Sequence, residues 1–170
     1  MHKSELIALI KFFSVKKAGN LIRLYLSFII SRVLKKSFIS GLPFALSIEP
    51  TTSCNLGCPE CPSGLKQFTR KKGNLSISLN KKIIDELKGK LTYINYYFQG
   101  EPYINKNFFD FIQYANSKKI FCSTSTNGHF LNDKNCVKTI ESGLKRLIIS
   151  IDGIAKRLMK YIGKKGNIKK

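Results

Sequence analysis

The sequence of 170 residues contains no tryptophan, two histidines and ten acidic residues against thirty basic ones. Long apolar runs are also missing. The longest uncharged stretch near the N-terminus, residues 24–31, is far shorter than the roughly 20 residues that span a bilayer. No cleavable signal peptide is evident, because residues 1–10 contain Glu5 and no small-residue cleavage site follows. We therefore expect a cytoplasmic protein without a membrane-crossing segment.

The scarcity of acidic residues leaves a net charge of +20, which points toward nucleic acid or an anionic membrane. The excess lies at the two ends. Residues 1–43 carry eight basic and one acidic residue, and residues 154–170 carry seven and none, whereas residues 44–153 carry fifteen and nine. Twenty-five of the thirty basic residues are lysine, although base and phosphate recognition favours arginine. We expect no specific nucleic-acid partner.

The cysteine pattern does not fit a framework of disulfide bonds. The five cysteines are an odd number, and three of them fall within eight residues at positions 54, 58 and 61, which argues for a reducing compartment. Cys122 and Cys136 fall on a predicted strand and a predicted helix. We expect these two to be structural, because unpaired cysteine commonly behaves as a small buried apolar residue.

Residues 4–37 have the apolar periodicity of helix, in two stripes interrupted around Gly19 and Asn20, with basic residues flanking both. One interpretation, which we favour, is a helical extension that packs its apolar face on the body of the protein. The alternative is peripheral contact of residues 1–37 with an anionic membrane surface. We assign residues 1–43 to this basic amphipathic extension.

From Phe44 the pattern changes to short apolar runs that alternate with amphipathic segments. The predicted strands are residues 44–48, 93–98, 120–124 and 147–151. The predicted helices are residues 81–88 with Asn80 as cap, 108–118, and 133–142 with Asn132 as cap and Gly143 as stop. Near-continuous apolar strands separated by helices predict an α/β fold with a parallel sheet.

Polar, glycine-containing motifs follow the four predicted strands, at residues 51–62, 99–102, 125–128 and 152–153. Parallel α/β sheets bind ligands at the carboxyl ends of their strands, so we expect the four motifs to converge on one site. Glu49 and Pro50 are expected to shape the exit of the first strand. We expect Tyr96, Tyr97 and Phe98 to form core or pocket wall.

The first motif contains the cysteines as Cys54-Asn-Leu-Gly-Cys58-Pro-Glu-Cys61. Thiolates this close in sequence can ligate one metal centre. Structural zinc requires four ligands, usually in two separated pairs, and His2 and His129 are distant in sequence. Three thiolates suit a 4Fe-4S cluster whose fourth iron is left open for a small molecule.

This loop resembles the cluster motif of the radical S-adenosylmethionine (radical SAM) superfamily. The segment Gln99-Gly-Glu-Pro102 resembles the Gly-Gly-Glu-Pro motif of that family, with Gln99 in place of the first glycine. The segment Ser150-Ile-Asp-Gly153 resembles one found in the branch that carries an auxiliary-cluster SPASM domain. The resemblance implies a partial (βα) barrel of six parallel strands, of which residues 44–153 supply about four.

The resemblance also implies a site and a reaction. The three loop cysteines would ligate a 4Fe-4S cluster, and Gly100 and Glu101 would hold the ammonium of S-adenosylmethionine (SAM). Candidates for its ribose and carboxylate are Thr126, Asn127, Ser150 and Asp152. An electron from a donor such as flavodoxin or ferredoxin would cleave SAM into methionine and a 5'-deoxyadenosyl radical, which abstracts hydrogen from a small-molecule or peptide substrate. The alternatives are turn and cap chemistry for the four candidates and an exposed loop carboxylate for Glu101.

No apolar strand run follows residue 153, and residues 154–170 are a basic tail. We expect an incomplete radical SAM domain that acquires a cluster but turns over little substrate, because half the barrel would be missing and one sheet edge would stay open. Other interpretations are a complete small protein that has lost half its barrel, a non-catalytic metal-binding basic module, and an inactive relic.

Overall fold

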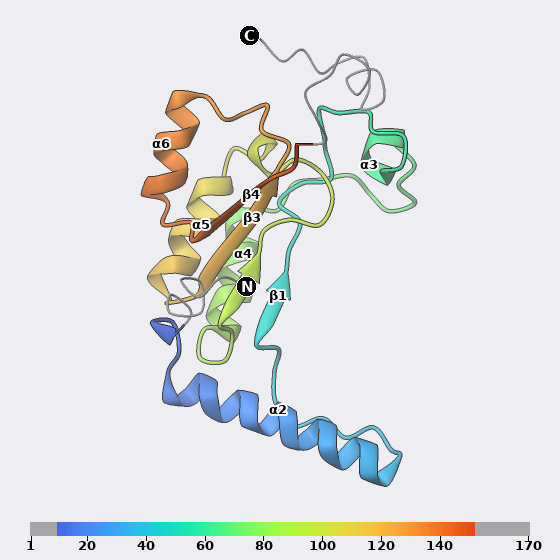
Figure 1. The fold of residues 1–170 in the computed structure, drawn as a ribbon, viewed down its shortest axis with the longest axis vertical. Coiled ribbons are helices and arrows are strands. Elements are labelled where there is room, and N and C mark those ends of the chain that lie inside the picture. The colour runs from blue at the N-terminus through green and yellow to red at the C-terminus, as the bar shows by residue number, and fades with distance from the viewer. Residues whose placement is uncertain (1–9, 152–170) are drawn as a thin grey trace.

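The computed structural model describes residues 10–151, and in that range the chain forms one parallel four-stranded sheet in the order β1-β2-β3-β4 (Figure 1). The strands are β1 (Ala45–Ser47), β2 (Tyr93–Asn95), β3 (Phe121–Thr126) and β4 (Arg146–Ile149). Register pairs Leu46 with Ile94, and Ile94 with Cys122. The α/β fold with four parallel strands is therefore confirmed.

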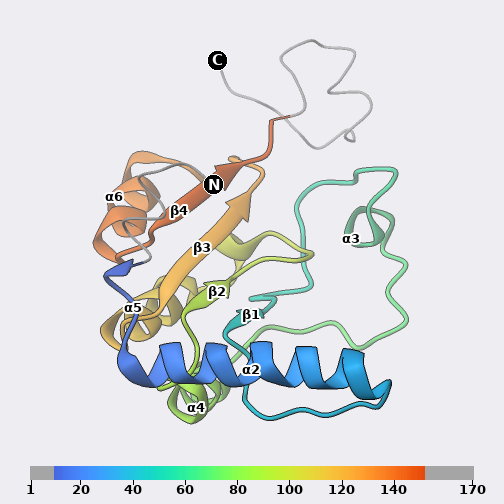
Figure 2. The same ribbon diagram turned by 60° about the horizontal axis from the view of Figure 1, so that its bottom comes forward.

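Helices connect successive strands. They are α4 (Ile77–Leu87), α5 (Phe108–Ser117) and α6 (Asp133–Glu141), with the short α3 (Pro62–Leu65) and a 3-10 turn, η1 (Pro102–Ile104), in the loops. Both ribbon views show α4, α5 and α6 on the same side of the sheet (Figure 1, Figure 2). The opposite side is free of these helices, and the loops after the strands meet at one end.

The core lies between the sheet and the helices α4 and α5. Its members are fully buried apolar side chains, among them Ile84, Leu91, Ile94, Phe111 and Ile112. This is the packing expected when near-continuous apolar strands are covered by amphipathic helices.

Two of the predicted helix caps have different outcomes. Asn132 caps α6 as predicted, because its side chain accepts a hydrogen bond from the amide of Asn135 at 2.9 Å. Asn80 was expected to cap α4, and this is wrong: Ser76 caps that helix. Asn80 is buried inside α4, where its Oδ1 accepts from the Tyr96 hydroxyl at 2.8 Å.

The N-terminal helix α2 (Val15–Leu34) begins after the Ser14 cap and runs without a break. The predicted interruption at Gly19 and Asn20 is wrong, because Asn20 is buried within the helix and bonds a neighbouring segment through its side chain. The predicted apolar stripe of this helix is divided: Leu21 and Leu24 are half-buried, whereas Phe28 and Ile29 are 55% and 39% exposed. Packing of the whole stripe on the body stays a prediction.

The two cysteines outside the loop differ. Cys122 is fully buried on β3, and burial raises the pKa of its thiol to about 12, which makes it an inert core residue as predicted. Cys136 is exposed on α6, so the expectation that it would be buried is wrong.

Within the described residues, no helix is both long and apolar enough to cross a membrane. The predicted basic tail, residues 154–170, lies outside the described range.

Candidate cofactor site

A cavity of about 210 Å³ opens at the carboxyl end of the sheet. All four loops that follow the strands contribute to its wall, and the fourth does so through Ser150. The lining residues are Cys54, Leu56, Cys58, Cys61, Ser63, Tyr97, Phe98, Gln99, Gly100, Glu101, Ser125, Thr126, Asn127 and Ser150. The predicted convergence on one site is confirmed for the motifs at residues 51–62, 99–102 and 125–128, and the fourth motif, residues 152–153, lies outside the described residues.

The three loop cysteines share the wall of this cavity, and each is half-buried. Cys61 directly precedes α3, and its amide donates to the carbonyl of Cys58 at 3.3 Å. Within residues 10–151, no group of three or more His, Cys, Asp or Glu side chains is gathered closely enough to hold a metal ion. The three cysteines therefore line one cavity, but their side chains are not close enough together to share a metal ion.

The Cys54 sulfur has the most clearly defined surroundings. It accepts long hydrogen bonds from the Leu56 amide at 3.5 Å and from the Asn127 side-chain amide at 3.9 Å. Burial raises the pKa of the Cys54 thiol, and the neighbouring Glu101 and Cys61 add to the rise. Because metal binding requires the thiolate, loading this residue would release a proton.

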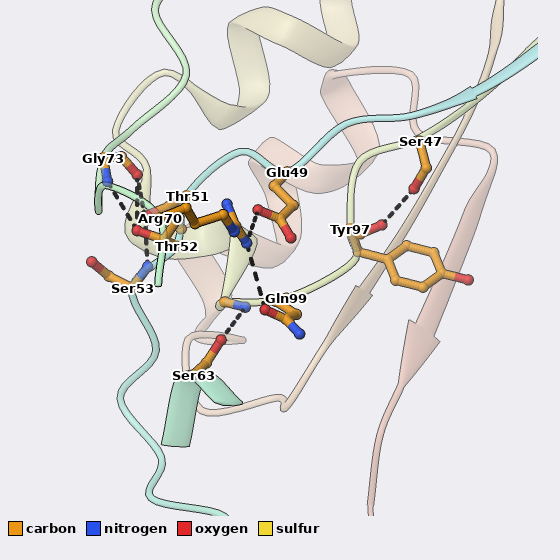
Figure 3. Close-up of polar contacts among 11 residues, drawn as sticks. Ser47, Glu49, Thr51, Thr52, Ser53, Ser63, Arg70, Gly73, Tyr97 and Gln99 are labelled. Carbon is orange, nitrogen blue, oxygen red and sulfur yellow. Dashed lines mark hydrogen bonds and ion pairs between the residues drawn. The ribbon is translucent and has the colours of Figure 1, made fainter. Parts of the chain in front are cut away.

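Gly100 joins the cysteine loop to the loop after β2. Its φ is +77°, and a Cβ at this position would lie 2.2 Å from the carbonyl oxygen of Thr51. Its amide donates to the Ser63 hydroxyl at 3.1 Å (Figure 3). The next amide, that of Glu101, donates to the Ser53 carbonyl at 2.8 Å. Glycine is thus required both by the backbone conformation and by the close approach of the two loops.

The start of the cysteine loop is fixed by a second set of backbone contacts. The Thr52 amide donates to the Gly73 carbonyl at 3.1 Å, and the Gly73 amide donates back to the Thr52 hydroxyl at 2.9 Å (Figure 3). The Thr51 hydroxyl accepts from the Ser53 amide at 3.1 Å. These bonds satisfy the backbone where β1 ends, so that the cysteines begin from a defined position.

Glu49 and Gln99 meet at Arg70 in the same region. The Arg70 guanidinium lies 2.6 Å from the Glu49 carboxylate and donates to the Gln99 side-chain oxygen at 3.5 Å (Figure 3). Gln99, the residue that replaces a glycine of the motif, therefore has a partner of its own. Glu49 ties the exit of β1 to the loop that follows α3, which agrees with the structural role predicted for it.

Glu101 is 2% exposed, so the alternative of an exposed loop carboxylate is wrong. Its two oxygens accept from the Thr126 hydroxyl at 2.8 Å, the Asn127 amide at 2.9 Å and the Tyr103 amide at 3.3 Å. Burial raises the pKa of this carboxyl, and the hydrogen bonds oppose the rise. All three donors are uncharged, and no ion pair among the described residues involves Glu101.

The predicted ribose and carboxylate contacts have partners within the chain. Thr126 donates to Glu101 and accepts from the Gly128 amide at 3.2 Å. The Asn127 side chain donates to Asn55 at 2.9 Å, and Ser150 shares a hydrogen bond with Ser125 at 3.1 Å. All of these but Gly128 and Asn55 line the cavity, and Thr126 and Asn127 fix the position of Glu101.

Sequence reasoning missed several supporting residues. Ser63 holds the Gly100 amide, and buried Asn105 donates to the Pro50 carbonyl at 2.6 Å and to the Leu75 carbonyl at 3.1 Å. His129, distant in sequence from the cysteines, contacts the Asn55 side chain at 3.1 Å. Their position next to the polar motifs could have identified these residues in the sequence, because polar side chains in such loops usually form hydrogen bonds with the backbone.

Comparison with known proteins gives a consistent result. Residues 48–170 match the radical SAM superfamily. The chain is 32% identical over 105 residues to an AdoMet-dependent heme synthase of Oleidesulfovibrio alaskensis, covering 62% of this chain and 27% of the relative. It is 32% identical over 122 residues to the mycofactocin maturase MftC of Mycobacterium ulcerans, covering 71% and 32%. The matches thus span about a third of the length of these relatives.

Solved structures show the same fold. BtrN in complex with AdoMet and 2-DOIA aligns with a TM-score of 0.60 at 23% identity, covering 72% of this chain and 52% of BtrN. SuiB of Streptococcus suis bound to S-adenosylmethionine aligns with a TM-score of 0.58 at 19% identity, covering 78% and 30%.

Proposed function

The chain belongs to the radical SAM superfamily, and we propose that its cavity binds a 4Fe-4S cluster through Cys54, Cys58 and Cys61 and binds SAM beside it. The observation that carries the proposal is the cavity itself, where three thiols and one buried carboxylate, Glu101, line the same space. Soft thiolate donors suit iron-sulfur clusters, and three of them leave one iron without a protein ligand.

Glu101 fits an ammonium ligand. A buried carboxylate that accepts three hydrogen bonds from uncharged donors, with no ion pair among the described residues, is stabilised when a cation enters beside it. We propose that Glu101 accepts from the ammonium of SAM and that Gly100 provides close backbone approach. Thr126 and Asn127 hold the carboxylate in place, and Ser150 and Asp152 are proposed for the ribose and carboxylate.

When bound and reduced, the cluster supplies the electron that cleaves SAM to methionine and a 5'-deoxyadenosyl radical able to abstract hydrogen from a substrate. The protein's own contribution is position and shielding. The Asn127 side chain bonds both the Cys54 sulfur and Asn55, which orients the first ligand of the loop. Tyr97 and Phe98 line the cavity and provide an aromatic part of its wall.

We propose that the partners are a peptide or another biosynthetic intermediate as substrate and a flavodoxin or ferredoxin as electron donor. Two relatives of equal sequence identity are an AdoMet-dependent heme synthase and a mycofactocin maturase, and their names give two different products, so similarity alone selects no single substrate. Three closely spaced thiols favour a reducing compartment, so the cytoplasm is the proposed location.

Anaerobic reconstitution with iron and sulfide tests the cluster. We expect a brown protein with about four iron atoms per chain, and loss of both colour and iron when Cys54, Cys58 and Cys61 are all replaced by alanine. The matched control is Cys136→Ala, since that cysteine is exposed on α6, outside the cavity. Equal iron in the triple variant and the control, or a colourless protein with stoichiometric zinc, would contradict the proposal.

Equilibrium dialysis of the reconstituted protein with labelled SAM tests the role of Glu101. We expect Glu101→Gln to retain its iron but to bind SAM at least about tenfold more weakly, because a charge-assisted hydrogen bond is lost. Release of 5'-deoxyadenosine under strong reductant then tests the reaction. Unchanged SAM affinity in Glu101→Gln would remove Glu101 from the proposed site.

A further inference from the structure

The helix α2 buries polar side chains and exposes apolar ones, whereas an ordinary surface helix does the reverse. Its most buried side chains are polar: Lys17, Asn20 and Ser27 are 3%, 5% and 4% exposed. Asn20 accepts from the Leu42 amide at 2.9 Å and donates to the Leu42 carbonyl at 2.7 Å. Ser27 accepts from the Ser40 amide at 2.9 Å. The polar stripe of the helix is therefore used to bond residues 38–42, which we call the strap.

The outward face of α2 is apolar. Val15, Ile22, Leu26, Ile29 and Val33 follow one another at intervals of seven, four, three and four residues, which places them on one face of a helix. Their exposed fractions are 90%, 59%, 52%, 39% and 74%. Five aligned apolar side chains in water are unfavourable unless another apolar phase covers them. We call this set the outer stripe.

All charged residues of α2 and of its flanking segments in residues 10–48 are basic. Arg23 and Arg32 are exposed on either flank of it by helical spacing, and Lys16, Lys35 and Lys36 are exposed near the helix ends. Between residues 6 and 48 the sequence has seven basic residues and no acidic one. The covering phase must therefore be apolar inside and negatively charged at its surface.

We propose that α2 lies in the interfacial plane of a lipid bilayer rich in anionic headgroups, with the outer stripe at the acyl boundary and Arg23 and Arg32 among the phosphates. A second copy of this chain would bring one basic rim against another, which charge repulsion opposes. The helix lies on the surface and does not cross it, in agreement with the absence of a spanning helix in residues 10–151.

The place of α2 in the fold makes this contact compatible with an open cavity. Both ribbon views show α2 at the end of the sheet where the strands begin, and the cysteine loop with α3 at the end where they finish (Figure 1, Figure 2). Lys17 donates to the carbonyl of Lys119, in the turn before β3, which fixes α2 at that end. The cavity and α2 therefore lie at opposite ends of the sheet.

Sedimentation of the full chain with vesicles tests the proposal. We expect binding to vesicles of phosphatidylcholine with 30% phosphatidylglycerol, and at least about tenfold weaker binding to phosphatidylcholine alone. The triple variant Ile22→Ser, Leu26→Ser, Ile29→Ser should lose at least about tenfold in affinity for the anionic vesicles. The matched control, Val137→Ser with Ile140→Ser, removes exposed apolar side chains of α6 and should bind as the wild type.

Three outcomes overturn the proposal. The first is no binding to anionic vesicles, and the second is equal binding by the α2 triple variant and the α6 control. The third is a dimer in sedimentation velocity that disappears in the α2 variant while vesicle binding is absent, because a second copy would then cover the outer stripe. Circular dichroism of each variant confirms that the fold is retained, since all substituted side chains are exposed.

Discussion

The two ends of the sheet use the same kind of bond for opposite purposes. At the carboxyl end, side chains such as Ser63 and Thr126 bond neighbouring loops and leave a cavity lined by thiols and a carboxylate. At the amino end, Asn20 and Ser27 bond the strap and leave an apolar helix face toward solvent. Buried polar groups thus build a polar site in one place and expose an apolar surface in the other. The outcome depends on whether the buried hydrogen bonds join the loops around a cavity or hold the polar face of a helix against the strap.

The largest expected effect belongs to the carboxyl end. Gly100→Ala should lower the free energy of unfolding by about 3 kcal/mol, because a Cβ would lie 2.2 Å from the Thr51 carbonyl at a φ of +77°. Thermal or urea unfolding measures the change. Gly57→Ala is the control within the cysteine loop, since a Cβ there has no neighbour within 4 Å. A similar loss of stability in both variants would show that the effect of Gly100→Ala does not come from the contact with the Thr51 carbonyl.

A somewhat smaller and more local effect is expected at the amino end. Asn20→Ala leaves both the amide and the carbonyl of Leu42 without their helix partner, at a cost of about 2 kcal/mol for opening of the strap. Hydrogen exchange should rise at residues 38–42 and stay unchanged in β2 and β3. The control is Arg23→Ala, at an exposed position of the same helix, which should change neither the stability nor the hydrogen exchange of residues 38–42. Faster exchange throughout the sheet would contradict the separation of the two ends.

A pH-dependent effect is expected at Glu101. Burial raises the pKa of this carboxyl above its ordinary value of 4.5, so the folded apoprotein binds the proton more tightly than the unfolded chain does. The stability of the wild type relative to Glu101→Gln should therefore be greatest below about pH 4.5 and should fall as the pH rises through the folded pKa. Urea unfolding of both proteins across this range measures the difference. A difference that is constant with pH would contradict the raised pKa.

The smallest effect is expected at the surface ion pair of the carboxyl end. Arg70→Ala removes the contact with Glu49, and because the Arg70 side chain is 47% exposed, we expect a loss below about 1 kcal/mol. The difference from wild type should shrink further in 1 M salt. A loss as large as that of Gly100→Ala would show that the charge pair, rather than the backbone contacts, holds the loop.

Much of the fold was predictable because it rests on local patterns. Apolar runs such as residues 120–124 are too continuous for a surface strand, and the polar motifs after them had to meet where parallel strands end. The cavity that contains Cys54 and Glu101 follows from that topology. The roles of the candidate ligands stay predictions, because the bonds of Thr126 and Asn127 in the structure are to the chain itself.

Other features depend on tertiary contacts that periodicity does not contain. The spacing of apolar residues in α2 indicates an amphipathic helix but not which face turns inward, and here the bonds of Asn20 to the strap decide it. Asn80 has the side chain of a cap, yet its partner is the Tyr96 hydroxyl on the far side of the core. Cys136 was expected to be buried only because unpaired cysteine commonly is, and its position on α6 leaves it exposed.

The contact between Gly100 and the Thr51 carbonyl has a consequence for protein engineering. An eight-residue cysteine motif transplanted to another scaffold would carry its ligands without the surface against which they are positioned. The transferable unit is the pair of loops, residues 51–63 together with residues 99–101, because the Gly100 amide bonds the Ser63 hydroxyl and the Glu101 amide bonds the Ser53 carbonyl. Designs that graft both loops on adjacent parallel strands should reproduce the site, and designs that graft one should not.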